Sequence, residues 1–307
     1  MGLRVLSLFD GIACGMQAFK ELGIPIDVYY ASEIEKNAIK VAKANHPEII
    51  EIGDVTEINF NDYIGKVDII IGGSPCQGFS VAGGRMAFLD ERSALIKYFF
   101  EAVETIKPKY FLLENVVMQK MYEHNIDEVL GVKAIRINSA LVSPQQRVRL
   151  YWTNIPEVTQ PEQIPDLNIE SLINKYSGVI LRDTWPEGEM HKLREEPTQF
   201  VDKCFYYGYT GPHKNQTTTL YSIKGKYPTL VLNNSGRRFL IDGKWKSFNA
   251  IGYELLQGLP MDYTKYAGEG GYRKREPLIG NAWCVPVIKH IFSFIPKEDY
   301  EDASKKG

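Results

Sequence analysis

VDIIIGGSPCQGFS, residues 67–80, is a short apolar run followed by a loop of glycine, proline and small polar residues. Such a run, bounded by turn-forming residues, is typical of a buried strand in a parallel sheet. Open α/β sheets bind their ligands just beyond the carboxyl ends of their strands. The pattern therefore places Cys76 at a ligand-binding edge, where its thiolate can act as a strong nucleophile. The alternative is a buried cysteine with no chemical role, the commoner situation for a lone cysteine.

A second apolar run repeats this arrangement with an acid in place of the thiol. Residues 111–116 read FLLENV, so Glu114 lies at the end of the run. A nucleophile and a carboxylate on neighbouring strand ends predict covalent chemistry on a ring that is also held by an acid. The alternative for Glu114 is a helix cap, a common role for an acid that follows a strand.

The first half of the chain alternates strand and helix signals. This alternation predicts an α/β fold in which a mostly parallel sheet is covered by helices on both faces. The expected strands are residues 4–9, 28–32, 49–52, 67–71, 110–113, 133–139 and 148–155, and the expected helices are residues 16–22, 34–44 and 93–106.

The alternation breaks after residue 156. Residues 157–165 are rich in Pro, Gln and Glu, as a linker would be, and the chain from there to about residue 275 is aromatic and rich in turns. We expect a second, smaller lobe here, and a last helix over residues 285–294 that returns to the first lobe. The predicted domains are residues 1–156 with 276–307, and residues 157–275.

Length and composition exclude several classes of protein. The chain has 307 residues, of which 44% are hydrophobic, and a net charge of −2, which argues against non-specific coating of DNA but not against a local basic cleft. No apolar run reaches membrane-spanning length. The four cysteines are far apart and show no CxxC or Cys/His ligand spacing, so we do not expect a structural zinc site, and the pattern does not suggest a disulfide framework. We expect an intracellular protein, cytoplasmic in a bacterium or phage-infected cell and nuclear if the source is eukaryotic.

The loop Asp10–Gly15 joins the first expected strand to the first helix and is built largely from small residues. Small residues let a ligand approach the backbone and the helix N-terminus. Glu33 follows the second strand about 20 residues later, where an acid can hold ribose hydroxyls. Asp54 follows the third strand, where a carboxylate can accept a hydrogen bond from an adenine amino group. These features predict a nucleotide site, and a simple turn with two helix-capping acids is the alternative. The full GxGxxG spacing of a dinucleotide site is absent.

Two groups of basic residues are candidates for binding anions. The segment QxRxR, residues 145–149, is expected to be extended, so that its two guanidinium groups lie on one side and suit a phosphate or a carbonyl oxygen. The second lobe carries basic clusters at residues 226–246 and 273–275, which could meet phosphates despite the acidic total. A solvated edge or hairpin is the alternative in each case.

Together these segments resemble the DNA (cytosine-5) methyltransferase family, from Leu6 to about Phe294. Many short motifs in the family's order are far more specific than any one of them. Residues 8–15, 113–117 and 283–292 are also similar to the catalytic domain of the animal de novo methyltransferases, whereas PCQ and GNA are found in bacterial and phage members. The matching segments are LFDG (8–11), SE (32–33), GDV (53–55), SPCQGFS (74–80), DxRxxL (90–95), ENV (114–116), QxRxR (145–149), YPTL (227–230), ELLQGLP (254–260), GNA (280–282) and VPV (285–287).

The resemblance implies a Rossmann-like sheet that binds S-adenosylmethionine, with the smaller lobe as a target-recognition domain. It implies that the Cys76 thiolate attacks C6 of a cytosine flipped out of the duplex. Glu114 would then hydrogen-bond N3 and the 4-amino group of that base. Arg149, with Arg147, would hold the cytosine O2 and a neighbouring phosphate.

Further residues follow from the same resemblance. The expected partner is double-stranded DNA, and no metal or membrane is expected. The loop 81–92 is expected to close behind the flipped base. The sequence does not assign an oligomeric state. The implied cofactor contacts are Phe9, Asp10, Gly11, Glu33, Ile34, Asp54, Val55, Pro75, Asn281 and Ala282. The implied contacts to DNA are Gln77, Ser80, Arg92, Arg237 and Arg238.

The chain departs from the family pattern at a few positions. Ala13 stands where many members have glycine, Trp283 follows GNA where a small aliphatic residue is usual, and the second lobe is short, which suggests a short recognition sequence or relaxed specificity. One alternative is a tRNA cytosine-5 methyltransferase of DNA-type architecture. Another is a silent nucleic-acid-binding homologue, which would have lost the nucleophile or the acid. Because Cys76 and Glu114 are both present, an active DNA enzyme is the main prediction.

Overall fold

The described part of the chain forms two compact units. Unit 1 comprises Met1–Ile137, Val148–Gln160 and Val287–Gly307, and unit 2 comprises Asn138–Arg147 and Pro161–Pro286. The computed structural model describes residues 2–75, 95–184, 190–191, 194–201, 203–210, 219–232, 237–268 and 271–301.

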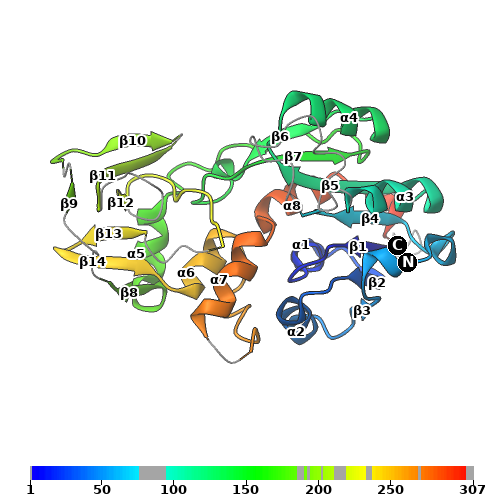
Figure 1. Cartoon of the computed structure of the whole chain (residues 1–307), viewed down its shortest axis with the longest axis horizontal. Coiled ribbons are helices and arrows are strands. Elements are labelled where there is room, and N and C mark those ends of the chain that lie inside the picture. Colours follow the sequence, from blue (N-terminus) through cyan, green and yellow to red (C-terminus); the bar gives the residue numbers. More distant parts are fainter. Residues whose placement is uncertain are drawn as a thin grey trace, which may run out of the picture. The chain divides into compact units, whose positions relative to one another are not determined.

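Unit 1 is built on a sheet that has seven strands among the described residues (Figure 1). β1 pairs in parallel with β2 and β4, and β4 pairs in parallel with β5, whereas β7 runs antiparallel to β5. The parallel pairs bring the carboxyl ends of β1, β2, β4 and β5 to one edge of the sheet. In spatial order the strands are β3 (Ile50–Glu51), β2 (Ile26–Ser32), β1 (Leu3–Leu8), β4 (Ile69–Gly72), β5 (Tyr110–Val116), β7 (Val148–Thr153) and β6 (Ile135–Asn138).

Helices cover both faces of this sheet, because alternate strand residues point to opposite sides. Ile70 of β4 belongs to the same core as Phe99 of α3 and Tyr122 of α4. Ile71 points the other way, and a Cβ added to Gly15 of α1 would lie 2.4 Å from its Cδ1. Glycine at this position therefore lets α1 pack directly on the sheet. The helices are α1 (Cys14–Leu22), α2 (Lys36–Asn45), α3 (Ile96–Ile106), α4 (Lys120–Leu130) and α8 (Val285–Phe292).

The first and last helices of unit 1 are joined by a stacked pair of rings. Phe19 of α1 and Phe292 of α8 are both fully buried, with ring centroids 4.1 Å apart and planes 6° from parallel. An ion pair of 2.9 Å between Lys289 and Glu21 links the same two helices near the surface. The predicted return of the last helix to the first lobe is therefore confirmed, and an apolar contact carries it.

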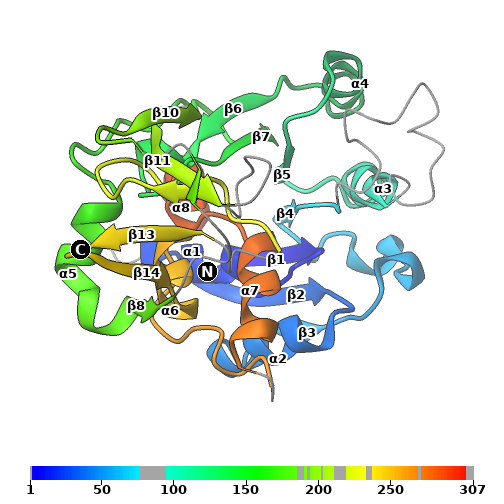
Figure 2. The same cartoon turned by 60° about the vertical axis from the view of Figure 1, so that its left-hand side comes forward.

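Unit 2 holds a second sheet, which among the described residues also has seven strands. Its pairs are antiparallel except β12 with β13, and Figure 2 shows the hairpin of β13 and β14 beside β8. The strands are β10 (Thr198–Val201), β11 (Cys204–Thr210), β12 (Thr219–Tyr221), β13 (Arg238–Ile241), β14 (Lys244–Phe248) and β8 (Leu181–Asp183), with β9 (Met190–His191) paired to β11. The helices of unit 2 are α5 (Ile169–Ile180), α6 (Ala250–Leu256) and α7 (Tyr272–Asn281).

Aromatic rings form the core of unit 2. The ring of Tyr227 is fully buried and lies within 6.4 Å, centroid to centroid, of the rings of Tyr221, Phe239, Phe248 and Tyr253. Aromatic side chains bury large areas and prefer the tilted and edge-on contacts seen here. The aromatic character of residues 157–275 is thus explained by packing.

Several sequence predictions need correction. The strands and helices expected in the first half are present with shifted ends, but α4 was missed, and the lobe expected to be irregular contains a sheet and three helices among its described residues. The compact units also differ from the predicted domains, because residues 138–147 and 276–286 pack with unit 2. Side chains and main-chain groups of these two segments share hydrogen bonds, which explains why they go together.

Two structural features are absent from the described part of the chain. Among the described residues, no group of three or more His, Cys, Asp or Glu side chains is arranged to hold a metal ion. In that same part of the chain, no helix combines the length and apolar character needed to cross a bilayer.

Replacing Phe292 by alanine should destabilise unit 1, because the stacking partner of Phe19 is lost and a cavity remains. We expect Phe292→Ala to lower the free energy of unfolding by about 3–5 kcal/mol, measured by urea titration followed by circular dichroism. Val129→Ala on α4 is the control, since Val129 is 60% exposed. That control should change the free energy by less than about 0.5 kcal/mol. Equal effects from the two substitutions would contradict the packing of α1 on α8.

Candidate active site

The loop after β1 has an unusual backbone. Phe9, Gly11 and Ala13 have φ values of 59°, 61° and 61°. Two of these three residues carry a side chain, and the left-handed region costs such residues roughly 1–3 kcal/mol each. Ala13 is the N-cap of α1 and has no polar side chain to cap it. Strained backbone of this kind clusters at ligand sites, so the loop is a candidate for binding through its backbone.

Glu33 is fixed in front of this loop by main-chain donors. Its Oε2 accepts a hydrogen bond of 2.8 Å from the Gly11 N–H. Its Oε1 accepts from the N–H groups of Ile34 at 2.8 Å and Glu35 at 2.9 Å. A carboxylate offers about four acceptor positions, so one remains for a ligand hydroxyl. The next residue, Ile34, is 68% exposed, and its side chain presents an apolar surface beside Glu33.

Asp10 lies under the same loop with its carboxyl group removed from water. Its Oδ1 accepts hydrogen bonds from the hydroxyls of Ser7 at 2.6 Å and Tyr29 at 2.7 Å. Its Oδ2 is buried and has no hydrogen-bond partner among the described residues. Desolvation raises the pKa of Asp10 to about 7, and the charges of Glu51 and Glu33 add to the rise. The hydrogen bonds from Ser7 and Tyr29 oppose this shift.

Asp54 begins a 3₁₀ turn after β3, over Val55–Glu57, and its Oδ1 accepts a hydrogen bond of 2.9 Å from the Thr56 N–H. The turn is tied to the end of β2, because the Ser32 hydroxyl donates to the carbonyl oxygen of Gly53 at 2.8 Å. The side chain of Val55 is buried in the unit 1 core. Only the backbone of Val55 is therefore available to a ligand.

Glu114 forms an ion pair with Arg149. The Nε of Arg149 lies 3.0 Å from Oε1 of Glu114, and both side chains are nearly buried. The pair follows from strand pairing, because Arg149 near the start of β7 is opposite Val116 at the end of β5. Truncating either partner would leave a poorly solvated charge without its counterion. The arrangement orients one carboxylate at the strand end where the sequence predicts an acid.

Asn115 connects this strand end to the loop that leads to Cys76. Its Nδ2 donates to the Ser74 hydroxyl at 3.1 Å and to the Ser74 carbonyl oxygen at 3.4 Å, and its Oδ1 accepts from the Val116 N–H. Both side chains are buried. Sequence reasoning assigned no role to Asn115 or Ser74, although an amide next to Glu114 in the ENV motif was the available signal. Pro75 is exposed.

Four predicted residues, Cys76, Gln77, Ser80 and Arg92, lie outside the described residues, as does the loop 81–92. Asn281 and Ala282 are described, and they lie at the carboxyl end of α7 in unit 2.

The prediction for Arg147 is wrong. Arg147 precedes β7, so strand alternation does not place its guanidinium beside that of Arg149. The Arg147 side chain is instead buried in unit 2, where it donates to the carbonyl oxygens of Leu230, Gly280 and Ala282. Both Nη atoms of this guanidinium are therefore committed to main-chain carbonyl groups of unit 2.

The predicted DNA contacts of Arg237 and Arg238 are contradicted as well. Arg237 is fully buried and donates to the carbonyl oxygens of Pro228 at 3.2 Å and Thr229 at 2.9 Å. Its guanidinium carbon lies 5.2 Å from the centroid of the Tyr227 ring, within range of a cation–π contact. Arg238, in β13, is only 7% exposed. The cluster of basic residues in the sequence suggested surface positions, but both side chains are buried in unit 2.

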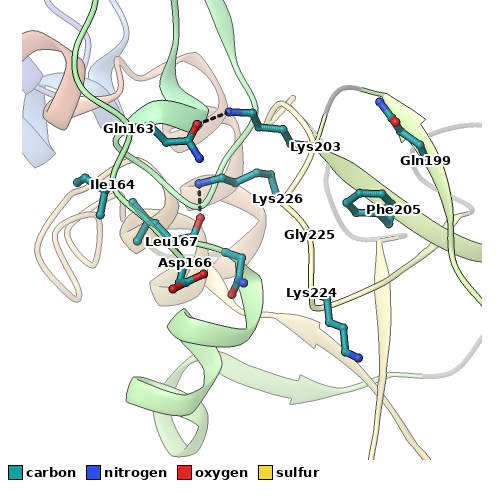
Figure 3. A pocket seen from close by; sticks show the side chains of 11 residues that line it. Gln163, Ile164, Asp166, Leu167, Gln199, Lys203, Phe205, Lys224, Gly225 and Lys226 are labelled. Carbon is teal, nitrogen blue, oxygen red and sulfur yellow. Dashed lines mark hydrogen bonds between the residues drawn. The ribbon is translucent and has the colours of Figure 1, made fainter.

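A cavity of about 340 Å³ in unit 2 contains none of the predicted site residues (Figure 3). Lys226 reaches across it to the carbonyl oxygens of Leu167 and Ser143, and Lys203 donates to Gln163 at 3.1 Å. Desolvation lowers the pKa of Lys226 to about 8. Both lysines thus fasten the segment 163–168 to the second sheet, and we assign this cavity a structural role.

The family model for C-5 cytosine-specific DNA methylases matches residues 3–297. The chain belongs to this family. The orphan methyltransferase M.SPRI of Bacillus phage SPR is 39% identical, over 90% of this chain and 74% of that protein. The type II methyltransferase M1.ScrFI of Lactococcus lactis subsp. cremoris is 36% identical, over 94% of this chain and 76% of that protein. The structure of Entamoeba histolytica methyltransferase EhMeth has the same fold, with a TM-score of 0.70, 13% identity, and coverage of 98% of this chain and 100% of that one.

Family membership makes the chain an S-adenosylmethionine-dependent DNA (cytosine-5) methyltransferase. The edge of unit 1 fits such a cofactor chemically. Glu33 has an acceptor position left for a ribose hydroxyl, and the exposed Ile34 offers an apolar surface to a purine. The Rossmann-like fold expected from the sequence is confirmed.

The raised pKa of Asp10 predicts how stability changes with pH. A carboxyl group with a pKa of 3.8 when unfolded and about 7 when folded binds its proton more tightly in the folded state. Ionisation between those two values therefore costs stability as the pH rises. Asp10→Asn has no such proton to lose, so it should not show this loss of stability. The free energy of unfolding of the variant minus that of the wild type should therefore rise by about 2 kcal/mol between pH 5 and pH 8. Urea titrations at both pH values measure this difference.

Ser7→Ala is the matched variant for that experiment. The Ser7 hydroxyl lowers the pKa of Asp10. Removing the hydroxyl should raise that pKa further, so the loss of stability should continue to a higher pH than in the wild type. A difference between Asp10→Asn and the wild type that stays constant from pH 5 to pH 8 would contradict a buried, titrating Asp10.

Proposed function

We propose that this enzyme methylates C5 of a cytosine flipped out of double-stranded DNA, through a covalent bond between Cys76 and C6. The observation that carries the proposal is the carboxyl edge of the unit 1 sheet. There the Glu114–Arg149 pair ends β5, and Asn115 holds Ser74, two residues before Cys76. An oriented acid at the end of β5 and a fixed Ser74 just before the nucleophile, after the adjacent strand β4, suit a reaction that activates a ring from two sides.

The covalent step is needed because C5 of an aromatic cytosine is a weak nucleophile. Attack of the Cys76 thiolate forms the S–C6 bond and moves the C5–C6 electron pair into an enamine, whose carbon C5 is nucleophilic. Glu114 would stabilise this electron-rich ring through N3 and the 4-amino group. Arg149 orients Glu114 and would reach the cytosine O2. After C5 has been methylated, loss of its proton restores the C5–C6 double bond and expels the Cys76 thiolate.

S-adenosylmethionine, when bound, supplies the methyl group. We propose that Phe9 packs on its adenine together with Ile34, that Glu33 binds the ribose and that Asp54 accepts the adenine amino group. The remaining contacts come from backbone or from cofactor-facing edges of Asp10, Gly11, Val55, Pro75, Asn281 and Ala282.

DNA is the substrate, and we propose that unit 2 recognises its sequence. A base stacked in a duplex cannot reach the strand ends, so it must be extruded, with Gln77, Ser80 and Arg92 holding the DNA around it. Arg237 and Arg238 are not part of this surface. At the start of α7, Arg273 and Lys274 are exposed and can meet phosphates.

Covalent trapping tests the mechanism. DNA whose cytosines carry fluorine at C5 has no proton for the enzyme to remove, so methylation should leave the enzyme attached to the base. With S-adenosylmethionine present, the wild type should form a complex with this DNA that survives a denaturing gel. Cys76→Ser should form none, because its hydroxyl is a far weaker nucleophile.

Cys204→Ser is the control, since Cys204 is buried in unit 2, and it should still form the complex. Trapping that persists in Cys76→Ser would overturn the assigned nucleophile. Methylation of ordinary DNA without any trapped complex would overturn the covalent route.

A further inference from the structure

Three buried polar side chains bring together the motifs of unit 2. Gln145, Arg147 and Gln257 are at most 5% exposed. They come from the QxRxR and ELLQG motifs, which are more than a hundred residues apart in the chain. Gln145 and Gln257 are hydrogen-bonded to each other, and Arg147 and Gln257 both donate to the carbonyl oxygen of Ala282. The three side chains also bond to the main chain of two further motifs, YPTL and GNA. We call these three side chains the buried network.

Arg147 caps the carboxyl end of a helix. Its guanidinium donates at 3.2 Å to each of three carbonyl oxygens, those of Leu230, Gly280 and Ala282. Gly280 and Ala282 lie at the end of α7, where the last carbonyl groups have no partner within the helix. The helix dipole also makes this end attractive to a cation. Arginine suits the position because its planar fork reaches several acceptors at once.

Gln257 and Gln145 complete the network. The Nε2 of Gln257 donates to the carbonyl oxygens of Ile279 at 2.9 Å and Ala282 at 3.0 Å. Gln145 donates to Oε1 of Gln257 at 3.0 Å and accepts from the Leu230 N–H at 2.9 Å. These hydrogen bonds end on main-chain groups or on another member of the network. The geometry leaves little freedom to the end of α7.

The backbone at this point is also closely packed. A Cβ added to Gly280 would lie 2.4 Å from the carbonyl oxygen of Val231. Glycine therefore allows residues 230–232 to touch the end of α7 directly, and Arg147 bonds to both segments. Asn281 lies between Gly280 and Ala282, two of the three residues whose carbonyl groups accept from Arg147.

We infer that Arg147 is a positioning residue: it fixes the segment Gly280–Ala282 and through it the cofactor contacts of Asn281 and Ala282. This inference rests on the proposed function, which places those two residues at S-adenosylmethionine. The two arginines of the QxRxR motif then have different roles. Arg149 orients Glu114 for the substrate, and Arg147 positions the end of α7 for the cofactor. Arg147 itself touches neither the base nor the DNA.

The two possible roles of Arg147 predict different defects. Loss of a residue that touches the base would slow covalent attack while cofactor affinity stayed unchanged. Loss of a positioning residue removes the Arg147 donor from the carbonyl groups of Leu230 and Gly280, leaves that of Ala282 with Gln257 alone, and lets Asn281 move. Cofactor affinity then falls, and trapping on fluorinated DNA recovers when the cofactor is saturating.

The test compares Arg147→Met and Arg147→Lys with Arg149→Met. Calorimetric titration with S-adenosylmethionine should give a dissociation constant raised roughly 10-fold or more in Arg147→Met, as expected for unpaired buried acceptors. Arg147→Lys should recover part of that affinity, because a lysine keeps the charge but not the fork. Arg149→Met should bind the cofactor as the wild type does and fail to form the trapped complex.

Wild-type cofactor affinity in Arg147→Met, combined with lost trapping at saturating cofactor, would overturn the inference. If Arg147→Met does not fold, Gln257→Leu provides the second variant, since it removes two bonds to the same end of α7 and should weaken cofactor binding in the same direction. Unchanged affinity in Gln257→Leu would then overturn the inference. If the wild type binds the cofactor but methylates no DNA, the proposed function is overturned and the inference is not. The calorimetric comparison would still decide the role of Arg147.

Discussion

The parallel alignment of β1, β2, β4 and β5 is the constraint on which the site depends. Parallel strands end at one edge of a sheet, so residues far apart in the chain are delivered to the same place. The loop at Phe9 follows β1, Glu33 follows β2, Ser74 follows β4 and Glu114 lies at the end of β5. The antiparallel β7 then adds Arg149 opposite β5.

Unit 2 depends on a different principle, in which buried cations are stabilised by hydrogen bonds to main-chain carbonyl oxygens. Arg147, Arg237 and Lys226 all donate to backbone carbonyl groups. Burying a charge is expensive unless it is hydrogen-bonded, so each of these side chains is committed to the segments it joins. The number of basic residues in this unit is therefore larger than the number that can contact DNA, because these three are buried.

The sequence allowed the sheet of unit 1 to be predicted because buried parallel strands are short apolar runs with polar residues at their ends. Glu114 and Glu33 could be found for the same reason. The direction of Arg147 could not, since strand periodicity does not apply one residue before a strand begins. The brace from Asn115 to Ser74 depends on the pairing of β4 with β5, which a local pattern does not specify. The second sheet was missed because its strands are short and aromatic and its core is assembled from distant segments.

The most direct test of the central claim is transfer of a labelled methyl group from S-adenosylmethionine to unmethylated double-stranded DNA, with unmodified tRNA assayed in parallel. Digestion to nucleosides then identifies the labelled product. The account predicts 5-methyldeoxycytidine from the DNA and no label in the tRNA, with the DNA signal lost in Glu114→Gln as well as in Cys76→Ser. Label in tRNA alone, or in DNA at a position other than cytosine C5, would contradict it.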